Sequence, residues 1–453
     1  MNHGGKTSKI IRDVVHGYIS LCENDLHIID TPLFQRLKRI RQTGAYSVYP
    51  SANHTRFEHS LGVMHLGMKV LESLGIDADE RISNTVRYAC LLHDIGHAPF
   101  SHLGEAFYSK EELINWLNIG LNNVGLTNTI MGSMGSPHEL CSCAIVLNKF
   151  ADRLLSYGVD LDLLCRMITG QKYNTSDKFT EDCLIDILNS DIDVDKLDYV
   201  LRDAFMSGAE LIAIDAERLI SAYTIHNGTL AFSGKALSTI GNLIYGRNAL
   251  YFWVYNHHIT VYTDFLFRRL IKYLIDTVPE GREELFTYES IAEKLADDYD
   301  LITFVRKYMS IDDYARDLYN QLFNRAFYKS LWKTPFEFEA IIKDPAHQDA
   351  FIRLVGQFRK EEDGLEELER RIIEANNGLT KGDFYIAVAD FKPFVPVAGK
   401  AVYIMLGDKR KRFQEIFQES IFQNPFREIP YIFVKNEQVK NILVNRLNEG
   451  RLL

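Results

Sequence analysis

The sequence predicts a mainly α-helical protein that ends in a small α/β region. Between residues 140 and 380, apolar positions recur at helical spacing in one segment after another, with short connections. After residue 380 the pattern changes. Residues 384–390, 401–406 and 431–434 are short apolar runs typical of strands, and helical runs follow near 411–421 and 436–448. We therefore expect a helical domain over residues 1–380 and a small α/β region over residues 381–453.

The N-terminal segment, residues 9–42, begins with a predicted strand-turn-strand over residues 9–21, with His16-Gly17 at the turn. Thr31 then caps a helix whose first residue is Pro32. The body of this helix carries four cations within six residues, at positions 36, 38, 39 and 41. They form either a solvated helix face or the lining of an anion site.

Capping and turn residues mark further elements along the chain. A helical run is expected over residues 56–74, and Ser136-Pro137-His138-Glu139 has the capping-box pattern that starts another helix. Asn227-Gly228 predicts the turn of a hairpin over residues 223–233. Residues 117–136 are rich in Gly, Asn and Ser, so we expect a loop there.

Composition and charge restrict the class of protein. The chain has 453 residues, of which 46% are hydrophobic and 25% charged, as in globular proteins. Its six cysteines are sparse and irregular, and its N-terminus lacks the apolar core of a secretion signal, so we expect reduced thiols and a cytoplasmic location. We expect no membrane span. A net charge of -10 argues against a nonspecific nucleic-acid binder but allows a local basic pocket for a phosphorylated small molecule.

Three histidines and an aspartate fall within ten residues near a predicted helix end: His93, Asp94, His97 and His102. The helix over residues 84–95 is stopped by a glycine and a proline. Neighbouring side chains on a helix point about 100 degrees apart, so His93 and Asp94 meet one ion only where a helix ends. The alternative is a polar helix cap with His93 as a hydrogen-bonded core residue. Three histidines beside an aspartate favour a metal site.

A second stretch, Asp193–Asp203, has an apolar back and a polar front if it is helical. Asp195, Tyr199, Arg202 and Asp203 share one stripe, with Lys196 on its flank. Alone, this pattern is typical of a solvated helix face. Beside the first stretch, Asp195 becomes a plausible ligand, and His59 is either a further ligand or a capped core histidine. Two imidazoles and two carboxylates suit iron, manganese, zinc or nickel, without singling one out.

The order His59, His93-Asp94, Asp195 resembles that of the HD-domain metal-dependent phosphohydrolases. Longer motifs resemble one branch, the deoxynucleoside triphosphate (dNTP) triphosphohydrolases, which includes the human SAM-and-HD-domain dNTPase and its bacterial relatives. The motifs are Lys9–Gly17, Ile29–Leu37, Arg56–Gly62, His93–His102 and Asp193–Tyr199. The resemblance runs from about residue 9 to 260. It implies an HD-domain helical bundle with a regulatory segment at residues 9–42, and we expect no SAM domain.

The resemblance also implies a role for each matching position. The metal would be held by His59, His93, Asp94 and Asp195. His97 and His138 would contact the α-phosphate, His102 would protonate the departing 5′ oxygen, and Glu105 would support a catalytic histidine in place of the family's aspartate. The substrate would be bound by Gln42, Arg56, Lys196, Tyr199, Asp203, Arg247 and Tyr255. Among these, Tyr199 would exclude a ribose 2′-hydroxyl, and Gln42 and Asp203 would read the 3′-hydroxyl.

The reaction implied is hydrolysis of a dNTP to a deoxynucleoside and inorganic triphosphate. It would use a divalent transition metal, with Mg²⁺ accompanying the nucleotide. The family implies a dNTP or GTP-type activator and a homotetramer built as a dimer of dimers. The activator positions are Lys9, Asp13, Asp30, Gln35 and Lys38. The family's usual arginine is replaced by Lys38, which cannot make a bidentate contact with guanine.

Other functions compete with this interpretation. One is an HD phosphohydrolase or phosphodiesterase that acts on another nucleotide, which the metal ligands alone do not exclude. Another is a nucleotide-sensing assembly module without turnover, against which the three additional histidines argue. A nuclease is the weakest alternative, because the chain is acidic.

Overall fold

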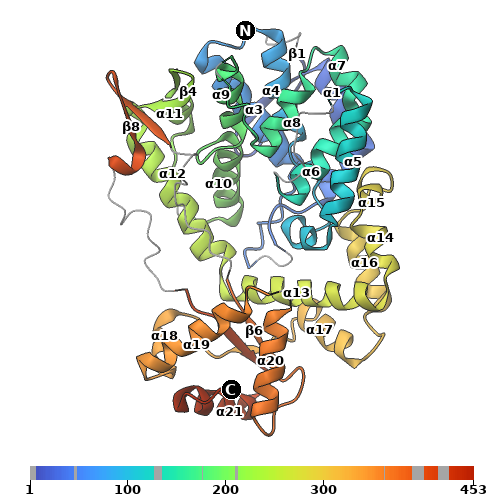
Figure 1. Ribbon diagram of the computed structural model, residues 1–453, viewed down its shortest axis with the longest axis vertical. Coiled ribbons are helices and arrows are strands. Elements are labelled where there is room, and N and C mark those ends of the chain that lie inside the picture. Colours follow the sequence, from blue (N-terminus) through green and yellow to red (C-terminus); the bar gives the residue numbers. More distant parts are fainter. Residues whose placement is uncertain are drawn as a thin grey trace. The chain divides into compact units, whose positions relative to one another are not determined.

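The computed structural model describes residues 7–44, 48–126, 135–175, 177–209, 213–361, 363–389, 402–416 and 428–453. Helices dominate these residues, which confirms the mainly α-helical fold (Figure 1). The chain divides into two compact units. Unit 1 contains Met1–Leu250, Val278–Phe304 and Phe394–Gln423, and unit 2 contains Tyr251–Thr277, Val305–Pro393 and Asn424–Leu453. None of the described helices is long and apolar enough to cross a membrane.

Unit 1 is built from short and medium-length helices. They are α1 (Glu23–Ile29), α2 (Pro32–Gln35), α3 (Arg56–Leu74), α4 (Glu80–Leu92), α5 (Lys110–Asn123), α6 (Pro137–Ile145), α7 (Ala151–Ser156), α8 (Leu161–Thr169), α9 (Phe179–Leu188), α10 (Val194–Ser207), α11 (Ala216–Ile220), α12 (Leu237–Leu250), α14 (Glu280–Leu285) and α15 (Tyr288–Ala292). The helix α16 (Asp298–Tyr308) begins in this unit. Helix α3 packs against both α4 and α10. Both contacts bury apolar side chains, and the contact between α3 and α10 also buries the polar side chains of His59, Asp198 and Arg202.

Local sequence signals fix both ends of the central helices. Thr55 and Glu58 form a capping box at the start of α3, and Asp193 accepts a hydrogen bond from the Lys196 amide at the start of α10. Both helices end at a glycine in the left-handed conformation, Gly75 and Gly208, which a side chain would disfavour.

Two sheets belong to unit 1. Strands β1 (Thr7–Asp13) and β2 (Gly17–Cys22) form the expected N-terminal hairpin. The second sheet has the order β3-β4-β7-β8, in which the hairpin of β3 (Tyr223–His226) and β4 (Thr229–Ser233) is continued by β7 (Tyr403–Leu406) and β8 (Lys409–Arg412). Strands β4 and β7 are parallel, although about 170 residues separate them along the chain.

Unit 2 combines one long helix with shorter helices and a three-stranded sheet. Its helices are α13 (His258–Thr277), α17 (Asp313–Phe323), α18 (Pro335–Ile341), α19 (Pro345–Phe358), α20 (Gly364–Ala375) and α21 (Glu437–Glu449). The sheet order is β5-β9-β6, where β5 is Lys329–Ser330, β6 is Phe384–Ala387 and β9 is Tyr431–Val434. Both partners of β9 lie antiparallel to it.

The contacts do not divide the chain at residue 380, where the sequence suggests a boundary. The strands after that position are shared between two sheets: β7 and β8 complete the sheet of unit 1, whereas β6 and β9 pair with β5 in unit 2. The unit to which each of these strands belongs therefore depends on its hydrogen bonds to strands much earlier in the sequence. It does not depend on the change in composition near residue 380.

Three local expectations differ from the structure. The helix expected from Pro32 onward shortens to α2 and a 3-10 turn over Arg36–Arg39, because the buried Arg36 guanidinium donates to the carbonyl oxygens of Ala296 and His97. The run near 411–421 begins as strand β8 and a 3-10 turn, and its residues 417–421 lie outside the described ranges. The expected loop over 117–136 is helical to residue 123, and residues 127–134 are outside the described ranges.

Candidate active site

Four residues from three helices converge at the centre of unit 1. His59 lies in the first turn of α3, His93 and Asp94 follow the last turn of α4, and Asp195 lies in the first turn of α10. A helix end is open on one side, so each of these positions directs a side chain toward a shared point. The structure thus brings together the four residues that the resemblance assigns to a metal.

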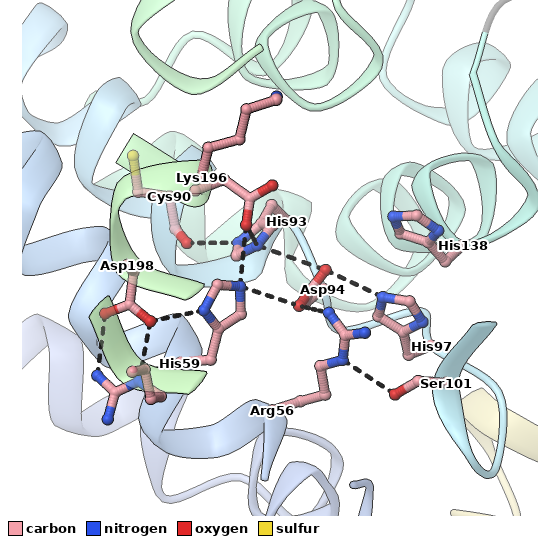
Figure 2. A network of polar contacts seen from close by, with 12 residues as sticks. Arg56, His59, Cys90, His93, Asp94, His97, Ser101, His138, Lys196 and Asp198 are labelled. Carbon is pink, nitrogen blue, oxygen red and sulfur yellow. Dashed lines mark hydrogen bonds and ion pairs between the residues drawn. The ribbon is translucent and has the colours of Figure 1, made fainter. Parts of the chain in front are cut away.

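Their ligand atoms lie close enough to share one ion. The Nε2 atom of His59 is 3.0 Å from Asp195 Oδ1 and 3.5 Å from Asp94 Oδ2. The Nε2 atom of His93 is 3.4 Å from Asp94 Oδ1 and 3.8 Å from Asp195 Oδ1. Figure 2 shows Asp94 between His59 and His97, with His93 above.

The outer nitrogen of each imidazole is held by the protein. His59 Nδ1 lies 2.7 Å from Asp198 Oδ2, and His93 Nδ1 lies 2.8 Å from the carbonyl oxygen of Cys90. Both Nε2 atoms are buried and have no well-aligned hydrogen bond among the described residues. Outer hydrogen bonds of this kind fix the tautomer and leave the Nε2 lone pair for a metal. Among the described residues, His59, His93 and Asp195 have ligand atoms at metal-site spacing, and Asp94 lies next to both histidines. These imidazoles and carboxylates fit a divalent transition metal without identifying it.

A second cluster lies beside the first and consists of three histidines around one carboxylate. Glu105, in the 3-10 helix Ser101–Phe107, places Oε1 at 2.6 Å from His138 Nδ1, 3.1 Å from His97 Nδ1 and 3.2 Å from His102 Nδ1. His138 comes from the first turn of α6, where its ring stacks on that of His97 with centroids 4.1 Å apart. His102 is the accessible member, with 64% of its side chain exposed.

The stacked pair of this cluster, His97 and His138, have opposite pKa shifts. Burial lowers the pKa of His138, but the Glu105 carboxylate outweighs burial and raises the pKa to about 9. Burial, Arg56 and the charged His138 lower the pKa of His97 to about 3. The pKa of Glu105 is far below its usual range, because His138 and His102 outweigh the effect of burial. Near neutral pH, His138 is therefore a cation and His97 is neutral.

The group of His97, His102, Glu105 and His138 also has a spacing that could hold an ion. However, Glu105 Oε1 lies within ion-pairing distance of all three imidazoles. The carboxylate and the cationic His138 already compensate each other in charge. An ion at this place would therefore have to compete with these ion pairs.

Asp94 connects the two clusters. Its Oδ1 atom is 3.4 Å from His93 Nε2 and 3.2 Å from His97 Nε2, while Oδ2 accepts a hydrogen bond of 2.7 Å from Arg56. Burial raises the pKa of Asp94, but Arg56 and the neighbouring histidines outweigh it and keep the carboxyl group ionised. A single carboxylate thus belongs to both the metal set and the histidine cluster (Figure 2).

Close backbone packing holds the turn that carries these residues. A Cβ atom on Gly96 would lie 2.3 Å from the Ser142 amide nitrogen of α6, so only glycine permits this approach. The Gly96 amide donates to Ser142 Oγ, and the buried Arg36 donates to the His97 carbonyl oxygen. Asp298 accepts a hydrogen bond from the amide of Phe100, which has a left-handed conformation.

The residues expected around the sugar form two pairs. Arg247 Nε donates to the Tyr199 hydroxyl at 3.1 Å. Asp203 Oδ1 lies 2.7 Å from Nε2 of the buried His54, whose carbonyl oxygen accepts from the Gln42 amide. Sequence reasoning missed His54. Its position two residues before the helix start at Arg56 was the available signal.

The other expected residues are less closely linked to the site. Lys196 pairs with Asp193 at 2.6 Å beside the metal set, whereas Tyr255 belongs to unit 2, and its place near a sugar stays a prediction. Among the activator positions, Gln35 accepts from Lys38 at 2.7 Å, and Lys9 and Asp30 are exposed. Asp13 differs from them because its buried carboxylate accepts a hydrogen bond from Arg202.

Comparisons with known proteins agree with this architecture. The HD domain family matches residues 56–122, and the HD associated region matches residues 214–349. The chain is 27% identical to the uncharacterized protein MJ1154 of Methanocaldococcus jannaschii, over 97% of this chain and 82% of that protein. It is 31% identical to the deoxynucleoside triphosphate triphosphohydrolase SAMHD1 homolog of Dictyostelium discoideum, over 58% of this chain and 48% of that protein. The chain thus spans about half the length of this relative.

A solved structure shows the same fold along most of the chain. The phosphohydrolase BT4208 from Bacteroides thetaiotaomicron aligns with a TM-score of 0.66 at 21% identity, over 94% of this chain and 100% of that chain. Three of the four expected metal ligands, His59, His93 and Asp94, lie within the matched HD domain. The fourth, Asp195, follows it on α10.

Proposed function

Because the chain carries an HD domain and is related to deoxynucleoside triphosphate triphosphohydrolases, we propose that it hydrolyses dNTPs to deoxynucleosides and inorganic triphosphate. The coarser activity, that of an HD-type phosphohydrolase, rests on the domain itself. The observation that carries the proposal is the shared Asp94, which places a metal-ligand set directly beside a cluster of three histidines. Metal-assisted cleavage of a phosphate ester needs both parts within reach of one substrate.

The four expected ligands would hold a divalent transition metal, which would supply Lewis-acid chemistry by acidifying water and polarising a phosphoryl oxygen. The protein's own part is to position and neutralise the substrate. His138 offers a positive charge near neutral pH, and Arg56 and Lys196 border the metal set, where they would offset the charge of a triphosphate.

Proton transfer to the leaving group is assigned to His102. It is the exposed member of the histidine cluster, and its Nδ1 atom lies 3.2 Å from Glu105 Oε1, which orients the ring. Departure of the 5′ oxygen of a deoxynucleoside requires a proton at that atom. An accessible imidazole oriented by a carboxylate suits the transfer, because its ordinary pKa is about 6.5.

Recognition of the sugar would come from the two pairs on and beside α10. Tyr199 and Arg247 are joined through the phenol oxygen, which would place an aromatic ring under the sugar and a cation toward the phosphates. Asp203 contacts the His54 ring, and Gln42 contacts the His54 carbonyl oxygen through its backbone amide; the side chains of Asp203 and Gln42 would read the 3′-hydroxyl. A ring packed under the sugar at Tyr199 leaves no room for a 2′-hydroxyl, which is the basis for a preference for deoxyribose.

Regulation belongs to the same proposal. We assign a dNTP or GTP-type activator to the surface of Lys9, Asp30 and Lys38, which are exposed, and the half-buried Gln35, where the two cations could bind the phosphates of a nucleotide. A homotetramer and a cytoplasmic location complete the proposal. Size-exclusion chromatography with light scattering, with and without nucleotide, tests the assembly.

Product analysis tests the reaction. Purified protein of known metal content is incubated with each dNTP alone, with dNTPs in pairs, with GTP and with a cyclic nucleotide, and products are separated by ion-exchange chromatography. We expect deoxynucleoside and triphosphate in equal amounts from dNTPs and far less product from GTP. An Asp195→Asn variant serves as control, because a contaminating phosphatase would remain active in it.

The alternatives predict different products. Cleavage of the cyclic nucleotide with intact dNTPs would instead identify a phosphodiesterase. Tight nucleotide binding without any released triphosphate, in protein that contains its metal, would identify a nucleotide-sensing module.

A further inference from the structure

A buried carboxylate outside the metal set, that of Asp198 on α10, touches the N-terminal hairpin and a metal ligand at once. Its Oδ2 atom lies 2.7 Å from His59 Nδ1 and accepts from Arg202 Nε at 2.9 Å. Its Oδ1 atom lies 2.5 Å from His16 Nε2 and accepts from Arg202 Nη2 at 2.9 Å. Two donors on each oxygen saturate the carboxylate. Figure 2 shows Asp198 to the left of His59, on the side away from Asp94.

The turn of the hairpin is fastened to the same network. His16 lies between β1 and β2, and Asp13 accepts hydrogen bonds of 2.8 Å from the amides of Val15 and His16. The second oxygen of Asp13 accepts from Arg202 Nη1 at 2.8 Å. The turn therefore reaches Asp198 by two routes, one through His16 and one through Asp13 and Arg202.

Space for this arrangement is made on α3. A Cβ atom on Gly62 would lie 1.9 Å from Asp198 Oδ1, so any larger residue would displace the carboxylate. Asp198 and Arg202 are fully buried, and burying two such charges is costly unless every polar atom is satisfied. An apolar contact would hold α3 and α10 together as well. The network therefore has a purpose beyond stability.

We propose that Asp198 is a positioning residue through which the N-terminal turn sets the orientation of the metal ligand His59, so that metal binding and the order of this turn are coupled. Asp198 accepts from His59 Nδ1 and so directs the Nε2 lone pair toward the metal set. Loss of the His16 donor would leave Asp198 Oδ1 with Arg202 alone, and the carboxylate could then turn and take the His59 ring with it. The coupling is reciprocal, because a metal that fixes His59 also fixes Asp198 and the turn.

This inference rests on the assignment of the metal site and goes beyond it to regulation. The turn is continuous with β1, which carries the expected activator residue Lys9. A ligand that orders or displaces the hairpin would thereby alter a metal ligand from outside the active site. The inference does not depend on the identity of the substrate.

Metal affinity and hydrogen exchange test the coupling without measuring activity. Metal-free wild-type protein and the His16→Ala and Asp198→Asn variants are titrated with Mn²⁺, and free Mn²⁺ is measured by electron paramagnetic resonance. Asp25→Asn is the matched control, since Asp25 is an equally buried carboxylate that binds Arg87 through two hydrogen bonds of 2.7 Å, away from the metal ligands. Hydrogen exchange of residues 13–20 is followed with and without Mn²⁺.

We expect Mn²⁺ to bind about 10- to 100-fold more weakly to His16→Ala and Asp198→Asn, the usual cost of losing an outer contact of a metal ligand. Affinity should be unchanged in Asp25→Asn and largely recovered in His16→Gln, which keeps an N–H donor. In the wild type, Mn²⁺ should slow exchange in the turn, and in His16→Ala it should not.

The inference would be overturned if His16→Ala bound Mn²⁺ as tightly as the wild type does. It would also be overturned if Mn²⁺ did not change the hydrogen-exchange rate of the turn in the wild type. His16→Ala decides the matter if Asp198→Asn does not fold. Absence of triphosphate release with intact coupling would refute the proposed function alone, whereas dNTP hydrolysis without coupling would refute this inference alone.

Discussion

The charge of His138 provides a sharp test of the histidine cluster, because Glu105 is the neighbour that raises its pKa most, ahead of Glu139 and Asp94. Glu105 Oε1 lies 2.6 Å from His138 Nδ1, and only 14% of the His138 side chain is exposed. In Glu105→Gln the carboxylate charge is lost while the shape of the side chain is kept. Burial is then opposed only by the weaker effects of Glu139 and Asp94, and the pKa of His138 should fall from about 9 toward its ordinary value of 6.5.

The size of the effect follows from the two pKa values of His138, about 9 in the folded protein against 6.5 for an unperturbed imidazole. At about 1.4 kcal/mol for each pH unit, the pair contributes about 3 kcal/mol to the free energy of unfolding. Because the folded-state pKa is raised, this contribution is complete below pH 6.5 and is lost as pH rises through about 9. In Glu105→Gln we expect no such decline between these pH values.

The assay is a nuclear magnetic resonance titration of protein labelled at the histidine ring carbons, with His138→Gln used to assign the signal. Turnover gives a second readout: with a pKa of 6.5, only about a tenth of His138 is charged at pH 7.5, so Glu105→Gln should lose about tenfold in rate and recover part of it at pH 6. A wild-type His138 that titrates near 6.5, or a pKa that is the same in Glu105→Gln, would refute the reasoning.

Three further changes test other parts of the site. Asp195→Ala removes an expected metal ligand, so bound metal measured by plasma mass spectrometry and triphosphate release should disappear together; a full metal content would contradict the assignment. Tyr199→Ala should raise the ratio of GTP to dGTP cleavage, and an unchanged ratio would remove Tyr199 from sugar selection. Gly62→Ala places a methyl carbon 1.9 Å from Asp198 Oδ1, which should lower the free energy of unfolding in urea by about 1–3 kcal/mol; wild-type stability would show that α3 and α10 separate freely.

Local signals in the sequence were sufficient to predict the helices and turns that position the residues of the candidate site. The capping box at Ser136, the helix ends near His93 and Asp195, and the hairpin turn at Asn227-Gly228 depend on residues within a few positions of each other. Such signals act through backbone conformation and side-chain caps, so they can be read without the fold. They were enough to predict that the expected metal ligands lie at the ends of helices.

Features that depend on distant residues could not be predicted in this way. The pairing of β4 with β7 joins segments with no shared pattern, and His54 meets Asp203 across 149 positions. The polar front of Asp193–Asp203 is by itself typical of a solvated helix face, and only the packing of α3 on α10 shows that Asp198 is buried beside His59. Tertiary packing gave these polar residues roles that their spacing in the sequence does not reveal.

The shared carboxylate of Asp94 has a consequence for how such a centre responds to a change of ion. One oxygen of Asp94 lies near both His93 and His97, so an ion with a longer or shorter preferred bond to oxygen would tilt the carboxylate and draw His97 with it. Exchanging manganese for zinc would then alter the pH profile of turnover as well as its rate. The acid–base behaviour of the site and the identity of its metal would then depend on each other, because both involve the Asp94 side chain.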